Sequence, residues 1–293
     1  MGREEGGRQH GNVENFFLGT LILWAVSICF QIIFNNRTQL LYVVAGTFFY
    51  QASNSLIRIF FCKPTKTNTH TDADRDALFV NTSVSLLHST ITSASVVFIL
   101  LRQVLSNGPN GMFDHSQLVE HTWPWAFEAL CFSCGYFAYD QWDMLCYHLY
   151  SGWIPSILVH HFVLLICFTL ALSRNVTINY LILTLVCELH SIFLHVRKLR
   201  RMSGVREAKS NLVKLEWFLN WFTFFVARSI PHVLITVKLI RDSNKFGRGM
   251  ELPLALFGMA GMNMLNIGLG LDLVKAFKRE RKPHQTNQHH HSE

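Results

Sequence analysis

The chain has 293 residues, of which 50% are hydrophobic and only 15% are charged, and its formal net charge is +7. Average proteins carry about 25% charged residues, so this composition excludes an ordinary soluble enzyme. Apolar runs of about 20 residues, long enough to span a hydrocarbon core of about 30 Å, recur along nearly the whole sequence. The composition therefore predicts a polytopic membrane protein.

We expect these runs to be α-helices, because lipid offers no hydrogen-bonding partner to the backbone. In chain order, the eight predicted helices are 16–34, 40–61, 78–101, 125–146, 154–172, 176–196, 215–239 and 252–273. The fold class is thus an all-α transmembrane bundle of about eight helices. The polar segment 1–15 precedes the first helix, and no small-residue cleavage site follows that helix. We therefore expect it to stay in the protein rather than to be removed as a signal peptide.

The connections predict the orientation of the bundle. The segments "RKLRRMSGVREAK" after the sixth helix and "KAFKRERK" after the eighth are rich in Lys and Arg. Because basic loops stay in the cytosol, both segments are predicted to be cytosolic, and eight crossings then place both termini there. Anionic lipid headgroups explain the positive charge, so no nucleic-acid partner is expected. An alternative for 40–61, which carries Arg58 near its end, is a partly interfacial helix.

Polar side chains at membrane depth are the candidate functional residues, because they are rare there and usually face the bundle interior. We single out a histidine pair, three acids, a further histidine and an arginine: His160, His161, Asp140, Asp143, Glu188, His88 and Arg228. At 1.5 Å per residue, the histidine pair lies roughly 10 Å and Glu188 about 12 Å from the cytosolic face. The aspartates share this depth, whereas His88 and Arg228 lie nearer the midplane of the membrane. We therefore predict one polar cavity that opens toward the cytosolic leaflet.

Structural roles are the alternatives to that cavity. Asp140 and Asp143 could cap a helix end or extend to the interface, and Glu188 could form an ion pair with Arg228. The histidine pair could form hydrogen bonds between helices. No metal site is predicted, because "CFSC" is a lone CxxC and the diiron histidine boxes HxxxH and HxxHH are absent.

Five segments carry a resemblance to a known family. In order and spacing, "LFVNTSVSLLHSTI", "CGYFAYDQWD", "LVHHFVLL", "LVCELHSIFLHVRKL" and "FFVARSIPHVLI" resemble the TLC domain, which ceramide synthases and translocation-associated membrane proteins share. The resemblance covers about 75–281, so 16–61 are two additional N-terminal helices and 282–293 is predicted to be a disordered cytosolic tail. Within the family, the sequence resembles TLC domain-containing proteins 1 and 2. This implies control of phospholipid acyl composition and membrane fluidity, with fewer polyunsaturated species, in the plasma membrane or alternatively the endoplasmic reticulum.

The histidine pair matches a pair in the ceramide synthases, which implies acyl transfer from acyl-CoA as an alternative function. His160 and His161 would assist the transfer, with Glu188 orienting an imidazole that acts as general base. The synthase series HD-x-x-D-x-x-x-E is not reproduced, since Glu188, Leu189 and His190 stand about 28 residues beyond the pair. This departure argues against acylation of a sphingoid base. A lipid transfer or scrambling protein is the second alternative. The expected partners are phospholipids or acyl chains, and no cofactor is expected apart from acyl-CoA as a co-substrate.

Overall fold

The computed structural model describes residues 2–62, 70–150, 156–204, 210–247 and 249–281, and every regular element in these ranges is helical. The helices are α1 (Gly2–Phe34), α2 (Leu41–Phe61), α3 (His70–Met112), α4 (His115–Val119), α5 (Ala126–Cys146), α6 (Ser156–Arg174), α7 (Ile178–Thr184), α8 (Glu188–Met202), α9 (Asn211–Thr223), α10 (Ile230–Arg241) and α11 (Glu251–Arg281). Between them lie η1 (Thr38–Leu40), η2 (Leu185–Cys187), η3 (Phe224–Ser229) and η4 (Ser243–Lys245). The predicted all-α fold is confirmed. The predicted tail 282–293 lies outside the described residues.

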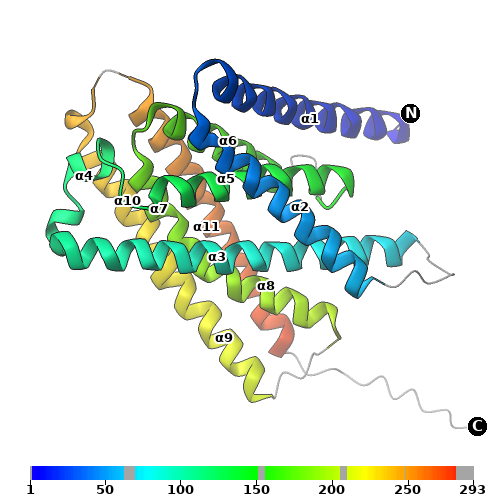
Figure 1. Cartoon of the computed structure of the whole chain (residues 1–293). Coiled ribbons are helices and arrows are strands. Elements are labelled where there is room, and N and C mark those ends of the chain that lie inside the picture. The colour runs from blue at the N-terminus through cyan, green and yellow to red at the C-terminus, as the bar shows by residue number, and fades with distance from the viewer. Residues whose placement is uncertain (1, 63–69, 151–155, 205–209, 248, 282–293) are drawn as a thin grey trace, which may run out of the picture.

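In Figure 1, α1 and α3 run from right to left, α2 runs back toward the lower right between them, and α11 runs obliquely from the upper left toward the bottom. The polar N-terminal segment is continuous with the first membrane helix, because α1 already begins at Gly2. Which end of the bundle faces the cytosol stays a prediction.

Within the described residues, six helical segments are long and apolar enough to cross a membrane: Val13–Phe34, Ala73–Gly108, Ser156–Arg174, Ile178–Met202, Asn211–Arg241 and Glu251–Glu280. The predicted spans 40–61 and 125–146 are helical but do not meet this criterion. The reason is their polarity, because α2 carries Asn54 and Arg58 and α5 carries Asp140, Gln141 and Asp143. Most of these polar side chains are buried between helices.

Helices α2 and α5 approach each other closely through glycine. A Cβ atom on Gly135 would lie 2.7 Å from the backbone nitrogen of Thr47, and one on Gly46 would lie 2.9 Å from the carbonyl oxygen of Phe132. Thr47 also donates a hydrogen bond from Oγ1 to the Gly135 carbonyl oxygen at 3.1 Å. Small residues at such a contact let two membrane helices pack backbone to backbone.

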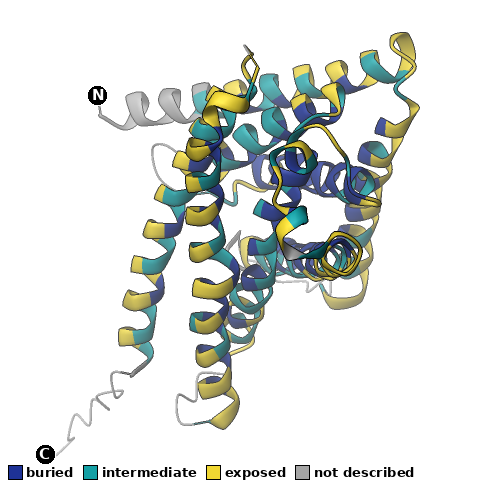
Figure 2. Ribbon diagram, turned by 90° about the vertical axis from the view of Figure 1, so that its left-hand side faces the viewer, coloured by how far each residue is buried: buried dark blue, intermediate teal, exposed yellow. Residues whose placement is uncertain are grey.

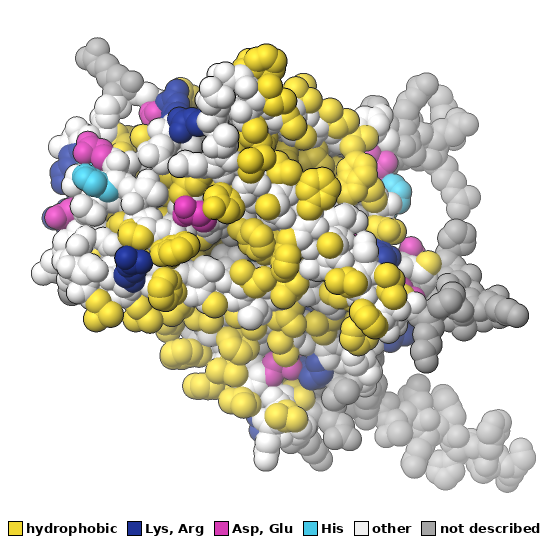
Figure 3. Space-filling model, in the orientation of Figure 1, with side chains coloured by type: hydrophobic (Ala, Val, Ile, Leu, Met, Phe, Trp, Pro, Cys, Tyr) yellow, Lys and Arg dark blue, Asp and Glu magenta, His cyan; other side chains and the backbone are white. Residues whose placement is uncertain are grey.

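The core lies around α5, whose residues are mostly buried, whereas α1 and α11 lie at the periphery (Figure 2). Only 17% of the apolar stretch of α1 and 11% of that of α11 are buried. Hydrophobic side chains cover much of the face shown in Figure 3, and many large hydrophobic residues are exposed along the helices. Such a surface suits lipid rather than water, as expected for a membrane protein.

Two predicted helices change their winding at the level of the candidate site. The sixth is divided into α7, the 3₁₀ turn η2 and α8, with Glu188 directly after the turn. The seventh contains η3, a π-helical segment that carries Arg228 and is followed by Pro231. Short π-helical segments inside α-helices are rare and occur frequently at functional sites.

Candidate functional site

Two aspartates on α5 form the centre of a buried polar cluster between α2, α3 and α5. Asp140 and Asp143 are 5% and 3% exposed and lie one helical turn apart. Asn81 of α3 donates from Nδ2 to Asp140 Oδ1 at 2.7 Å and to Asp143 Oδ2 at 3.0 Å. Asn54 of α2 donates to Asp143 Oδ1 at 3.1 Å, and Arg58 Nη2 lies 4.0 Å from the same oxygen. The aspartates therefore join helices in the interior and do not extend to the interface.

The adjacent histidines on α6 point into different surroundings, because successive side chains project about 100° apart around a helix of 3.6 residues per turn. His161 is buried, and its Nε2 lies 3.6 Å from Asp140 Oδ2, so it belongs to the aspartate cluster. His160 is half-buried and lines a cavity instead. The pair thus connects the polar cluster with the cavity.

Glu188 lies where α3 meets the start of α8. Ser89 of α3 donates from Oγ to Glu188 Oε2 at 2.7 Å, and His88 Nδ1 lies 3.8 Å from the same oxygen. His88 stacks on the ring of Tyr136, with 3.7 Å between the ring centroids. Neither ring nitrogen of His88, which is 1% exposed, is hydrogen-bonded to another described residue. The site thus combines a carboxylate with a fully enclosed imidazole.

Arg228 fastens the π-helical segment to α8 and α11. Its Nε donates to His190 Nδ1 at 3.0 Å, its Nη2 donates to Ser191 Oγ at 2.7 Å, and its Nη1 donates to Asn266 Oδ1 at 3.4 Å. Because His190 Nδ1 accepts this hydrogen bond from Arg228, the ring carries its hydrogen on Nε2 and is the neutral imidazole. Within the described ranges, no ion pair joins Arg228 to Glu188, so that structural alternative is not what the geometry shows.

A cavity of about 600 Å³ lies between α6, α7, α10 and α11. Its walls are mainly aliphatic, sulfur-containing and aromatic side chains, including Leu164, Cys167, Phe168, Leu181, Leu185, Ile235, Leu239, Leu254, Met259 and Met262. His160 in the first half of α6 lines it, as does Glu188 at the start of α8, and Arg174 and Glu251 line it at the other end of α6. Some lining residues, such as Phe257 and Met264, are also exposed on the outer surface, so the cavity opens sideways toward lipid.

Only two of the seven residues singled out in the sequence line this cavity, namely His160 and Glu188. The other five, His88, Asp140, Asp143, His161 and Arg228, lie in the polar clusters behind its wall. The physical reason is that each of the five packs against polar groups on neighbouring helices, which keeps it out of the apolar space. The single cavity that we expected is therefore an apolar cavity backed by a polar interior.

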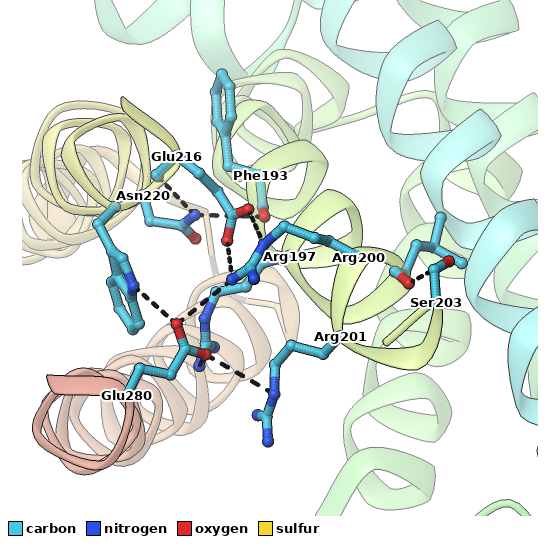
Figure 4. A network of polar contacts seen from close by, with 10 residues as sticks. Phe193, Arg197, Arg200, Arg201, Ser203, Glu216, Asn220 and Glu280 are labelled. Carbon is cyan, nitrogen blue, oxygen red and sulfur yellow. Dashed lines mark hydrogen bonds and ion pairs between the residues drawn. The ribbon is translucent and has the colours of Figure 1, made fainter. Parts of the chain in front are cut away.

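A second polar network closes the end of the bundle near the end of α11 (Figure 4). Glu280 accepts hydrogen bonds from Arg197 Nη2 at 3.1 Å and from Trp217 Nε1 at 3.0 Å. Glu216 accepts from Arg200 Nε at 2.5 Å, and Arg200 Nη2 also reaches Glu280 at 3.4 Å. These contacts hold α8, α9 and α11 together.

Several partners in the site were missed in the sequence. Asn54, Asn81 and Ser89 stand in otherwise apolar helices, and a polar residue at that depth is itself a signal. Their partners could not be foreseen, because each hydrogen bond joins helices far apart in the chain. The basic segment after the sixth helix predicts orientation from the sequence, and in the structure its first residues also hold α11 in place.

The fold and the cavity define an integral membrane protein of many helices with a lipid-sized apolar chamber. A TLC domain family model matches residues 78–275, which is most of the chain, and the chain belongs to this family. The match lies within the range 75–281 predicted from the motifs, and α1 and α2 precede it.

Curated relatives point to the same branch of the family. TLC domain-containing protein 2 of Homo sapiens is 26% identical over 217 residues, which are 72% of this chain and 75% of that protein. The protein of the same name in Danio rerio is 26% identical over 67% of this chain and 75% of its own length. TLC domain-containing protein 1 of Gallus gallus is 27% identical over 63% of this chain and 69% of its own length. No solved structure matches.

Proposed function

We propose that this TLC-domain protein binds a long acyl chain of a membrane lipid in the cavity beside α6 and thereby sets the acyl composition of membrane phospholipids. The observation that carries the proposal is the cavity of about 600 Å³, which has mainly apolar walls and includes the polar residues His160 and Glu188 in its lining. An apolar chamber of this kind suits a hydrocarbon chain, and a few polar groups orient its head. The similarity to TLC domain-containing proteins supports a role in limiting polyunsaturated phospholipids.

A substitution that fills the cavity tests the proposed function. Leu181 lines the chamber on α7, so Leu181→Trp occupies space that the chain would need. Leu212 is 76% exposed on α9, so Leu212→Trp adds the same bulk outside the chamber and serves as the matched control. In cells that lack the protein, wild type and Leu212→Trp should restore the phospholipid acyl profile measured by mass spectrometry, and Leu181→Trp should not. Full restoration by Leu181→Trp at equal expression would contradict the proposal.

Acyl transfer is a second candidate, because an imidazole, His160, and a carboxylate, Glu188, both line the cavity. A neutral imidazole at His160 would accept a proton from a hydroxyl or amine as that group forms a bond to the acyl carbonyl carbon of a thioester. The carbon–sulfur bond breaks and the coenzyme A thiolate leaves, taking up a proton from the imidazolium. The acceptor is then a lysophospholipid or an aminophospholipid.

Purified protein separates binding from catalysis. With acyl-CoA and a lysophospholipid, catalysis predicts product formation by wild type, loss of product in His160→Ala, and retention in His121→Ala, whose histidine is exposed beside α4. With a sphingoid base, we expect little or no ceramide. If wild type forms no product with either acceptor and still restores the acyl profile in cells, its effect rests on lipid binding.

The orientation and compartment belong to the same proposal. We propose that both termini lie in the cytosol, on the strength of the basic segments that follow Val196 and Leu273. The resemblance to TLC domain-containing proteins 1 and 2 supports the plasma membrane as the compartment, with the endoplasmic reticulum as the alternative. Epitope tags inserted between α8 and α9 and after the last residue should bind antibody only in permeabilised cells. Labelling of either tag in intact cells would reverse the orientation.

A further inference from the structure

The cavity is bounded at both ends by polar residues and follows α6 between them. Ser156, His160, Cys167, Ala171 and Arg174 all line it, so it extends along nearly the whole helix. Along α11 its lining runs from Leu265 back to Glu251 in the same way. The space is thus long and narrow, and it lies parallel to two helices of the bundle.

An ion pair closes the end opposite His160. Arg174, the last residue of α6, pairs through Nη1 with Glu251 Oε1, the first residue of α11. Both side chains also line the cavity. A hydrocarbon chain that extends from His160 gains nothing by passing a charged pair, because burying that pair against hydrocarbon costs its hydration. The pair therefore marks the point where an apolar chain must end.

The length of the part of the chamber between His160 and Arg174 can be expressed in methylene groups. Fourteen residues separate His160 from Arg174, which at 1.5 Å per residue is roughly 21 Å. A fully extended peptide advances at most about 3.6 Å per residue over three backbone bonds, or about 1.2 Å per bond. On the same scale, an extended acyl chain of about 17 to 18 bonds fills the distance.

Gly258 lies halfway along the wall that α11 contributes. It is seven residues from Glu251 and seven from Leu265, or roughly 10 Å from each end of the chamber. The nearest side-chain atom to a Cβ added there is Cys167 Sγ of α6, at 3.6 Å. This is ordinary contact, so a methyl group fits, whereas a larger side chain must extend into the chamber.

On the basis of the proposed function, we propose that the chamber selects acyl chains by length. The Arg174–Glu251 pair sets the maximum length of the chain. The absence of a side chain at Gly258 keeps the half of the chamber between Gly258 and this pair open. The favoured ligand is a lipid with one long chain of about 17 to 18 bonds, with its polar head beside His160 and Glu188.

Two variants should move the preferred length in opposite directions. Gly258→Phe fills the chamber at its midpoint and should favour chains of about half the original length. Glu251→Ala removes the charged stop and should allow chains longer than those that wild type prefers. For a chain that comes from water, each methylene group that no longer fits lowers the affinity of the ligand about fourfold. The ratio of long-chain to short-chain affinity should therefore fall at least about tenfold in Gly258→Phe.

The controls lie on the same helix. Gly268 is exposed and has no atom within 4 Å of an added Cβ, so Gly268→Phe places the same ring outside the chamber. Asp272 forms an exposed ion pair with Lys275, so Asp272→Ala removes a matched pair that does not line the cavity. Both controls should keep the length preference of the wild type.

The measurement is competition binding on purified full-length protein in detergent, with lysophospholipids whose saturated chains run from about 8 to about 22 carbons. Opposite shifts in Gly258→Phe and Glu251→Ala, with unshifted controls, support the inference. If wild type binds the lysophospholipids but neither variant changes the preferred length, selection by length is refuted and the proposed binding function stands. If wild type binds none of them at any length, the proposed function itself fails.

Discussion

The contact between α2 and α5 depends on Gly135 having no side chain. In Gly135→Ala, the new Cβ would lie 2.7 Å from the Thr47 backbone nitrogen, closer than real Cβ atoms come. Backbone atoms cannot rotate away, so the two helices must separate, which lengthens the hydrogen bond from Thr47 Oγ1 to the Gly135 carbonyl. Overpacking of this kind costs roughly 1–3 kcal/mol. Alanine returns up to about 1 kcal/mol through its helix propensity, so the variant should be destabilised by up to about 2 kcal/mol.

A second glycine isolates the steric effect. Gly268→Ala gains the same helix propensity on α11, but its Cβ meets nothing within 4 Å. The two variants should therefore differ in stability by roughly 1–3 kcal/mol, which is the overpacking cost alone. Thermal unfolding of both proteins in the same detergent, followed by the loss of the monodisperse peak on size exclusion, measures this difference. Equal unfolding temperatures would refute the close approach of α2 and α5.

Three further variants test the polar interior and the two ends of the bundle. Asn81→Ala removes the amide that donates hydrogen bonds to both aspartates of α5. A hydrogen bond to a charged group contributes about 1.5–3 kcal/mol, so the variant should be destabilised by about 2 kcal/mol or more. An unchanged unfolding temperature would contradict these hydrogen bonds. Burial opposes ionisation of Asp242, but hydrogen bonds from Lys238 and Lys245 hold the pKa of its carboxyl group below the usual 3.8. The ionised Asp242 therefore stabilises the folded state above about pH 4, and this stabilisation is lost as the pH falls further. Asp242→Asn should therefore be less stable than wild type at pH 7, with a gap that narrows below pH 4; a gap of constant size would count against the ion pairs. Glu280→Gln removes the carboxylate charge that faces the α8 arginines and should lower the free energy of unfolding by about 1–2 kcal/mol. An unchanged unfolding temperature would contradict this.

Much of the site was predictable as a set of polar residues but not as a geometry. The cost of placing a carboxylate or imidazole in an apolar helix identifies Asp140, His161 and Glu188 from the sequence alone. Their partners are invisible there, because Asn81 and Ser89 approach them only after α3 packs against α5 and α8. The division of the histidine pair between a cavity and a polar cluster also depends on which neighbours α6 meets.

The sequence by itself determined that this is a membrane protein, that its fold is all-helical, and that it belongs to the TLC-domain family. Hydrophobic run length and the hydrogen-bonding needs of the backbone in lipid leave few other structures, and both can be counted along the chain. Only the tertiary structure decided that α2 and α5 bury their polar faces against each other, that η2 and η3 interrupt two helices beside the site, and that Arg174 meets Glu251 at the end of a long chamber. These features depend on contacts between residues distant in sequence, and the packing of helices against one another, rather than any local pattern, selects them.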